Sequence, residues 1–293
     1  MLPLQRIFND KRTLQAVLCI SVDHFHALAN DLERLHAKSY EYPGRRRAVG
    51  AGRKSKLATP QDRLAFILFY LKVYPTFDLL GVFADLNRSE CCRWVHHLLP
   101  LLEQALGQRQ LLPKRQIRSM EEFRAAFPRA REVFLDGTER PVQRPQKPSQ
   151  NRKTYSGKKK RHTRKNLVMT DGARRIGYLS PSFRGARHDK RLADRTGVVG
   201  HIPPGVELFV DSGFQGVRHP GARLPVKGSR RRPLDDGLRF WNRLVSSIRV
   251  GVEHAIGGMK RLATCAAVYR NRLPKTDDRF NVIGAGLWNL HLT

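Results

Sequence analysis

The stretch GVELFVDSGFQG, residues 205–216, places an apolar run directly before an aspartate, a serine and a glycine. A short run of branched and aromatic side chains with glycine on either side is typical of a buried β-strand. The strand would end on Asp211, at the position where open sheets tend to carry their ligands. Gly213 and Gly216 leave the following backbone without a Cβ, so the turn could pass close to a ligand. Ordinary turn geometry would explain the same glycines.

A second carboxylate follows the same kind of strand. The run REVFLD, residues 131–136, ends on Asp136, and a glycine comes next. Further β-prone runs occur at 165–170 and 174–180, and residues 234–263 are predicted to be helical. This last segment could form one long helix, or two helices broken near the glycine pair at 257 and 258.

The first part of the chain is predicted to be helical instead. Residues 21–37 repeat phenylalanine and leucine at helical spacing after Ser21, a good N-cap. Three more helices are expected, the first beginning after Thr59 and stopping at Pro75, and the third capped by Ser89. Any small helical bundle shows this pattern, and so does a helix-turn-helix. In a helix-turn-helix, the side chains that reach base edges would be those of Arg88, Glu90 and Arg93.

The composition favours a nucleic-acid partner. The 293 residues include 55 Lys or Arg and 25 Asp or Glu, a formal net charge of +30. Such an excess is typical of proteins that neutralise phosphates and release counterions. A ribosome-associated or RNA-binding protein is an alternative, but no aromatic-rich stacking motif is apparent. The four cysteines have no C-x-x-C spacing, and no apolar run is long enough to cross a bilayer, so we expect a cytoplasmic protein.

Three acids are candidates for a metal site. Asp136 and Asp211 end their strands, and Glu253 lies within the predicted helix. They are 75 and 42 residues apart in sequence, so only the fold can bring them together. Three carboxylates suit Mg²⁺ or Mn²⁺, and two such ions can activate the attacking oxygen and stabilise the leaving oxygen of a phosphodiester. The alternative is structural: Asp-Gly pairs form turns, and Glu253 could pair with Arg249 on a helix surface.

Two basic residues share a helical face with Glu253. Arg249 precedes it by four residues and Lys260 follows it by seven. Such a face could hold the acid on a metal while both bases bind DNA phosphates, or it could be a solvated charged stripe.

Several of these segments together resemble the DDE transposases of bacterial insertion sequences, in the branch with a Harbinger-like catalytic domain. LDGTERPVQRP resembles the first acidic block, FRGARHDKRL a following His-Asp block, FVDSGFQG the second acidic block and RVGVEHAIGGMKR the third. RLAFILFYLKVYPTFDLLGVFADLNRSECCRWV is similar to the amino-terminal helix-turn-helix of the family. The likeness covers roughly residues 20–292, and two positions depart from it: Ser246 and Phe214 stand where relatives often have tyrosine.

The resemblance implies an α+β protein: an N-terminal helical helix-turn-helix domain, residues 1–115, followed by a ribonuclease-H-like α/β catalytic domain, residues 116–293. Asp136, Asp211 and Glu253 would be both the catalytic residues and the ligands of two Mg²⁺ or Mn²⁺ ions. As a bacterial, nucleoid-associated protein, it would cut and rejoin double-stranded DNA at terminal inverted repeats and in the target, as a homodimer when two ends are paired. Phosphate contacts are expected from Lys158, Lys159, Lys160 and Arg161.

Three alternatives stay open. The chain could be a catalytically silent DNA-binding regulator derived from a transposase, and metal-dependent cleavage would distinguish the two. It could be a nuclease that cuts but never joins, which a strand-transfer assay would reveal. The third alternative is the RNA-associated basic protein.

Overall fold

Two units divide the chain between them. The structure is a computed structural model that describes residues 7, 10–41, 54–229, 233–271, 273 and 276–293. One unit comprises the described part of 1–112 with Lys260–Ala266 and Arg279–Thr293, and the other comprises the described part of Pro113–Met259 and Ala267–Asp278. Residues 260–266 and 279–293 therefore pack with the N-terminal helices, whereas we expected a catalytic domain that runs from 116 to 293. The functional division at residue 115 stays a prediction.

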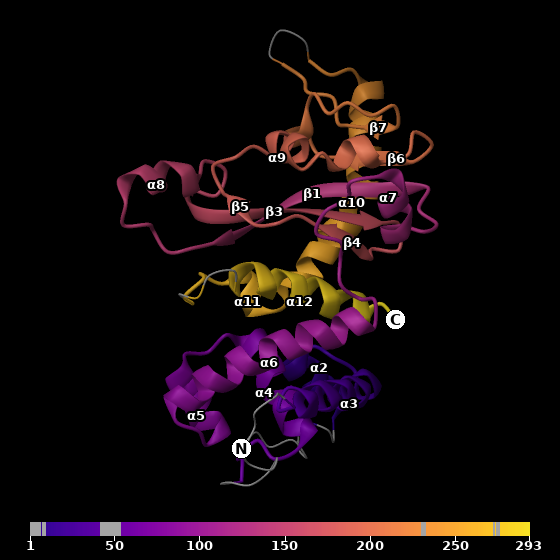
Figure 1. Cartoon of the computed structure of the whole chain (residues 1–293). Helices are drawn as coiled ribbons and strands as arrows, with labels where there is room; N and C mark the ends of the chain where they lie inside the picture. Colours follow the sequence, from indigo (N-terminus) through magenta and orange to yellow (C-terminus); the bar gives the residue numbers. More distant parts are fainter. Residues whose placement is uncertain (1–6, 8–9, 42–53, 230–232, 272, 274–275) are drawn as a thin grey trace. The chain divides into compact units, whose positions relative to one another are not determined.

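The first unit is helical (Figure 1). Its central helix α4 is buried on nearly every side, which explains why its sequence is apolar without a clear period. Thr59 caps α4 in a reciprocal capping box with Asp62, as expected from Thr59-Pro60. The helices that contribute to this unit are α2 (Lys11–Leu18), α3 (Val22–Lys38), α4 (Pro60–Val73), α5 (Phe77–Ala84), α6 (Arg88–Gln108), α11 (Ala263–Ala266) and α12 (Thr276–His291).

The predicted helix-turn-helix segments form α4, α5 and α6, with one correction. Ser89 does not cap α6. The cap is Asn87, whose side chain accepts a hydrogen bond from the Glu90 backbone N–H at 2.9 Å, while the Glu90 carboxylate accepts one from the Asn87 N–H at 3.0 Å. An amide and a carboxylate three residues apart satisfy two free N–H groups at once, which a serine inside the first turn cannot do. The predicted basic arm, residues 43–56, lies outside the described residues except for 54–56.

The second unit is built on a mixed seven-stranded sheet in which the order β2-β3-β1-β6-β7 is extended by β4 and β5, both paired with β3. β1 runs antiparallel to β3 and parallel to β6, and β6 runs parallel to β7. Strands were expected at 131–136, 165–170, 174–180 and 205–211, and each is present. The strands are β1 (Glu132–Pro141), β2 (Tyr155–Ser156), β3 (Arg161–Asp171), β4 (Ile176–Leu179), β5 (Phe183–Arg184), β6 (Glu207–Val210) and β7 (Ala222–Arg223).

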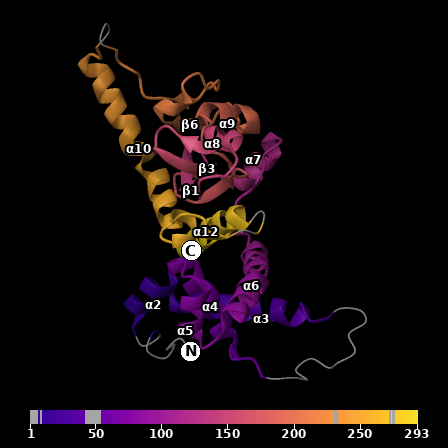
Figure 2. The ribbon, with the colours of Figure 1, turned by 90° about the vertical axis from the view of Figure 1, so that its left-hand side faces the viewer.

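Different helices pack on the two faces of this sheet. Alternate residues Val133 and Leu135 belong to a buried cluster with α7 (Met120–Ala126) and α9 (Asp189–Thr196). The intervening Phe134 stacks on Phe209 of β6 with ring centroids 5.3 Å apart. Figure 2 shows α10 (Asp236–Lys260) on the other side of the sheet from α7. The α+β prediction is confirmed: a helical region is followed by a mixed sheet with helices on it.

The long helix α10 is continuous from Asp236 to Lys260. The alternative of a break near Gly257 and Gly258 is therefore wrong, because a glycine costs a helix only about 1 kcal/mol when the flanking residues are good helix formers. No helix in the described part of the chain has the length and apolar character that crossing a membrane requires.

Candidate active site

The register of the sheet brings two predicted acids together. The last residues paired between the parallel strands β1 and β6 are Leu135 and Val210. The next residue along the chain is Asp136 on β1 and Asp211 after β6. Neighbouring strands lie about 4.8 Å apart, so the two aspartates occupy adjacent positions at one place on the sheet. The sequence placed each acid at the end of a strand, and the pairing of β1 with β6 is what brings the two positions together.

Both carboxylates are held by backbone N–H groups. Asp136 Oδ1 accepts a hydrogen bond of 2.7 Å from the Gly137 N–H. Asp211 Oδ1 accepts one of 2.7 Å from the Gly213 N–H and so caps the short 3₁₀ turn η2 (Ser212–Phe214). These bonds orient both carboxylates, and each bond occupies one of the two carboxylate oxygens.

A buried arginine approaches the pair from α10. Arg249 Nη2 lies 3.3 Å from Asp136 Oδ2, and the Arg249 side chain is only 10% exposed. The Arg249 Nε has no hydrogen-bond partner in the structure. The Arg249 guanidinium is thus engaged with Asp136. Its contact with a DNA phosphate stays a prediction. Lys260, also predicted to bind phosphate, is half-buried at the end of the same helix.

A third carboxylate, outside the three predicted ligands, enters from the opposite face of the sheet. Asp189 is the first residue of α9. A Cβ built on Gly137 would lie 2.5 Å from Asp189 Oδ1, and one built on Gly213 would lie 3.3 Å from Asp189 Oδ2. The space that the two glycines leave open is therefore filled by this carboxylate. The one available sequence signal was its place in FRGARHDKRL, the His-Asp block of the resemblance.

A buried lysine on β3 balances the charge on that face. Lys165 Nζ lies 3.0 Å from Asp189 Oδ1 and 3.2 Å from Glu139 Oε1, and it donates a 3.0 Å hydrogen bond to the Arg187 carbonyl. Burial lowers the pKa of Lys165, but the two carboxylates outweigh this effect and the net direction is upward. Lys165 therefore stays charged and holds Asp189 against the sheet.

The surroundings of Asp136 disfavour its charged form. Burial raises the pKa of this carboxyl to about 6, with the negative charges of Asp211 and Asp189 acting in the same direction. The Arg249 guanidinium and the Gly137 N–H act against this rise. The site is thus a place where carboxylates crowd together and an added cation would be stabilising.

Glu253 is not joined to this group. It lies on α10 one helical turn beyond Arg249, with an exposed side chain. In the described residues no three His, Cys, Asp or Glu side chains lie close enough together to hold a metal ion. The oxygen ligands available here nevertheless suit a hard divalent cation, because Asp136 and Asp211 offer adjacent carboxylate oxygens. Neither a hydrogen bond nor an ion pair within the described chain ties down the Glu253 carboxylate, so a rotamer change could reorient it.

Most of the other residues predicted to contact DNA are exposed. At the start of α6, Arg88 and Arg93 are exposed, and Arg88 lies 3.9 Å from Asp78, while the Glu90 carboxylate is occupied by the helix cap. The four basic side chains of the β2–β3 hairpin turn are all exposed. These are Lys158, Lys159, Lys160 and Arg161.

Comparison with known proteins gives consistent matches. The family model described as DDE superfamily endonuclease matches residues 135–289, a range that begins just before Asp136 and includes Asp211 and Glu253. The model described as helix-turn-helix of DDE superfamily endonuclease matches residues 55–108, the α4–α6 segment. A "probable transposase for insertion sequence element IS702" from Microchaete diplosiphon is 29% identical over 249 residues, which cover 82% of this chain and 83% of that protein. No solved structure matches the chain significantly.

Proposed function

Because the chain belongs to the DDE superfamily endonucleases, with a helix-turn-helix before the nuclease region, we propose that it is a DNA transposase that cuts and rejoins strands at the inverted-repeat ends of an insertion sequence. The observation that carries this proposal is the β1–β6 register, which supports a shared site for Asp136 and Asp211. The net charge of +30 supports a DNA partner.

Asp136, Asp211 and Glu253 would hold the divalent cations, Mg²⁺ or Mn²⁺ and two in number. When bound, such ions lower the pKa of the attacking oxygen and stabilise the charge on the leaving one. Arg249 would keep Asp136 ionised by offsetting part of the burial that raises its pKa. The hairpin from Lys158 to Arg161 would hold the DNA backbone without reading its sequence.

The reaction consists of two phosphoryl transfers. In the first, a water oxygen bonds to phosphorus and gives up a proton, the bond between phosphorus and the 3′ oxygen breaks, and that oxygen leaves as a 3′-hydroxyl. In the second, the 3′-hydroxyl oxygen attacks a target phosphorus and the target's own 3′ oxygen leaves. Each step forms one P–O bond and breaks one, so no oxidant or energy source is consumed. Pairing of two ends would use a homodimer.

The position of Glu253 favours one second candidate. Its exposed carboxylate does not contact Asp136 or Asp211, as expected for a catalytically silent DNA-binding regulator derived from a transposase. Such a protein would bind the element's ends through α4–α6 and leave them uncut.

The test uses duplexes from the DNA that flanks the coding region, with Mg²⁺ or Mn²⁺. We expect the full chain to nick these duplexes and to join precut ends to a target, and we expect Asp211→Asn to bind DNA as the wild type does while cleavage disappears. Asp236→Asn makes the same charge change at a side chain that is 97% exposed and serves as the matched control. Cleavage by Asp211→Asn at the wild-type rate would refute the role of Asp211. Binding without cleavage by the wild type would identify the regulator, and cleavage without joining would identify a nuclease.

A further inference from the structure

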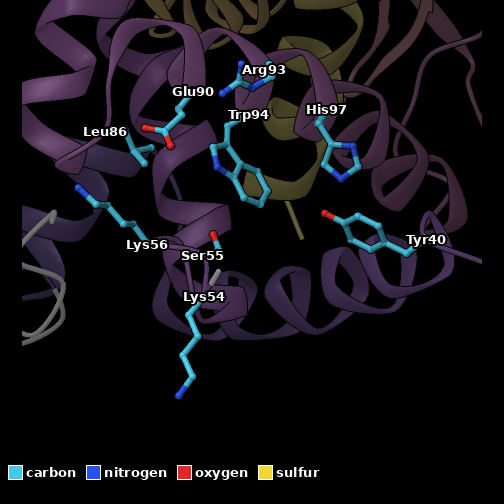
Figure 3. Close-up of a pocket in the computed structure, with 9 residues that line it drawn as sticks. All are labelled: Tyr40, Lys54, Ser55, Lys56, Leu86, Glu90, Arg93, Trp94 and His97. Atoms are coloured by element: carbon cyan, nitrogen blue, oxygen red, sulfur yellow. The ribbon is translucent and has the colours of Figure 1, made fainter. Parts of the chain in front are cut away.

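The helical unit contains a pocket of about 370 Å³ beside the start of α6. Its lining comes from four places: Tyr40 just after α3, the segment before α4, Leu86 between α5 and α6, and the first half of α6. Figure 3 shows the Trp94 indole projecting from α6, with Lys56 on one side and Tyr40 and His97 on the other. This volume falls in the range of pockets that hold small organic ligands, roughly 300–1,000 Å³.

One wall of the pocket is aromatic and supported from behind. Trp94 stacks on His36 with ring centroids 5.8 Å apart and an interplanar angle of 19°. Its indole also meets the His97 ring edge-on at 5.9 Å, and Tyr40 lies 5.9 Å from His97. Burial lowers the pKa of both His36 and His97, so these rings are neutral near pH 7. The wall therefore offers uncharged aromatic surface, on which a flat aromatic ligand would stack.

The rim of the pocket is positively charged. The positive charge of Lys56 is balanced by Asp85, because the Lys56 Nζ donates to the Asp85 carbonyl at 2.6 Å and pairs with the Asp85 carboxylate at 2.8 Å. Arg93 and Lys54 are exposed and form no ion pair with any residue that the structure describes. Glu90, the acid in the lining, is held by the Asn87 N–H at the helix cap. Figure 3 shows the Lys54 side chain extending away from Trp94, so Arg93 is the available cation beside the stacking surface. An aromatic surface next to a cation matches a ligand with a flat ring and a phosphate.

We propose that this pocket binds one unpaired nucleotide of DNA, with the base against Trp94 and its phosphate on Arg93. A base inside an intact duplex cannot enter a concave pocket, so the nucleotide has to be single-stranded or turned out of the helix. Stacking on an aromatic side chain accepts any base, which suits an unpaired position rather than sequence readout. This inference rests on the proposed function, because it takes DNA as the substrate. It adds that the protein recognises a distorted or unpaired base next to α6.

The experiment compares the full chain on two probes by fluorescence anisotropy: a blunt DNA duplex, and the same duplex with one unpaired 2-aminopurine. We expect tighter binding to the second probe and loss of 2-aminopurine fluorescence as the base stacks on Trp94. Trp94→Leu should remove roughly tenfold or more of this preference, the usual scale for losing one stacking side chain. Arg93→Gln, a surface change that leaves the aromatic wall intact, should reduce the preference in the same direction. Arg12→Gln on α2, an exposed arginine outside the pocket, is the matched control and should leave the preference unchanged.

The outcomes separate the two proposals. Equal binding of both probes, a preference kept by both Trp94→Leu and Arg93→Gln, or tighter binding of an RNA version of the bulged probe would each overturn the pocket assignment and leave the transposase proposal standing. A preference lost in both variants, from a protein that never cleaves its flanking DNA, would support the pocket and contradict the transposase.

Discussion

Arg249 and Asp136 lie 3.3 Å apart, Nη2 to Oδ2, although 113 residues separate them in the sequence. This contact brings α10 to the point on β1 where the first predicted catalytic acid lies. It also gives Asp136 the cation that offsets its burial and the nearby charges of Asp211 and Asp189. The ion pair therefore belongs to the electrostatics of the site as well as to the packing of the helix.

Replacing Arg249 should damage the site more than the fold. In Arg249→Gln, Asp136 keeps its burial and loses its cation, so its pKa should rise further and its ionised form should become scarcer near neutral pH. We expect cleavage to fall at least about tenfold, with stability lower by about 1–3 kcal/mol because a partly buried carboxylate is left without its partner. Cleavage assays and urea unfolding measure the two effects. Arg243→Gln, exposed on the same helix, is the control; equal activity of the two variants would contradict the role given to Arg249.

Gly137 should be intolerant of any side chain while Asp189 is present. The Cβ of Gly137→Ala would lie 2.5 Å from Asp189 Oδ1 and 2.9 Å from its Cγ, and Lys165 holds that carboxylate in place. We expect a loss of about 1–3 kcal/mol in the free energy of unfolding, the usual cost of overpacking. The double variant Gly137→Ala with Asp189→Ala should lose less than the two single losses added together, because the clash is gone. Gly205→Ala, where the Cβ meets no atom within 4 Å, is the control; strict additivity in the double variant would show that the contact carries no energy.

The local features of the fold were predictable because contiguous residues determine them. Thr59-Pro60 begins α4 through a cap that its own neighbour Asp62 completes. The apolar runs before Asp136 and Asp211 become β1 and β6, and parallel pairing then aligns both acids. Ser89 was the wrong cap because the choice between it and Asn87 depends on a reciprocal bond with Glu90 that composition does not reveal.

The rest of the site depends on contacts across the sheet. Asp189 reaches it only because Gly137 and Gly213, 76 residues apart in sequence, open space on the same face. Lys165 becomes its partner through the antiparallel pairing of β3 with β1, which no local pattern in the basic segment 141–165 indicated. The joining of Glu253 to Asp136 and Asp211, expected from the resemblance, stays a prediction.

Stability should fall in mild acid because of His36. This ring is buried in the helical unit next to His97, Tyr40 and Arg63, and burial lowers its pKa from 6.5 to about 4. The unfolded chain therefore takes up a proton below about pH 6.5 that the folded chain refuses until about pH 4, so the free energy of unfolding decreases across that window, by up to roughly 3 kcal/mol. Urea unfolding in this pH range should show a shallower decrease for His36→Gln, with His97 supplying the remainder. His26→Gln, at an exposed position, should keep the wild-type pH dependence, and an unchanged slope in His36→Gln would contradict the assignment.

The basic turn of the β2–β3 hairpin should contribute affinity for DNA without specificity for its base sequence. Replacing Lys158, Lys159, Lys160 and Arg161 together by glutamine should weaken binding to all duplexes alike and reduce the slope of log K against log salt by up to about 3.6, or about 0.9 for each phosphate that is no longer neutralised. Titrations at several salt concentrations measure this slope. The control replaces four exposed basic residues outside the hairpin by glutamine: Arg12, Lys38, Arg124 and Arg243. An equal reduction in the control would mean that only net charge matters.

We propose that Glu253 joins Asp136 and Asp211 on shared divalent cations. The most direct measurement is the calorimetric titration of Mn²⁺ into the full chain bound to DNA, for the wild type and for Glu253→Gln, with Glu121→Gln on the exposed surface of α7 as the control. We expect Glu253→Gln to lose Mn²⁺ affinity and strand cleavage together, while Glu121→Gln keeps both. Wild-type Mn²⁺ affinity and cleavage in Glu253→Gln would contradict it.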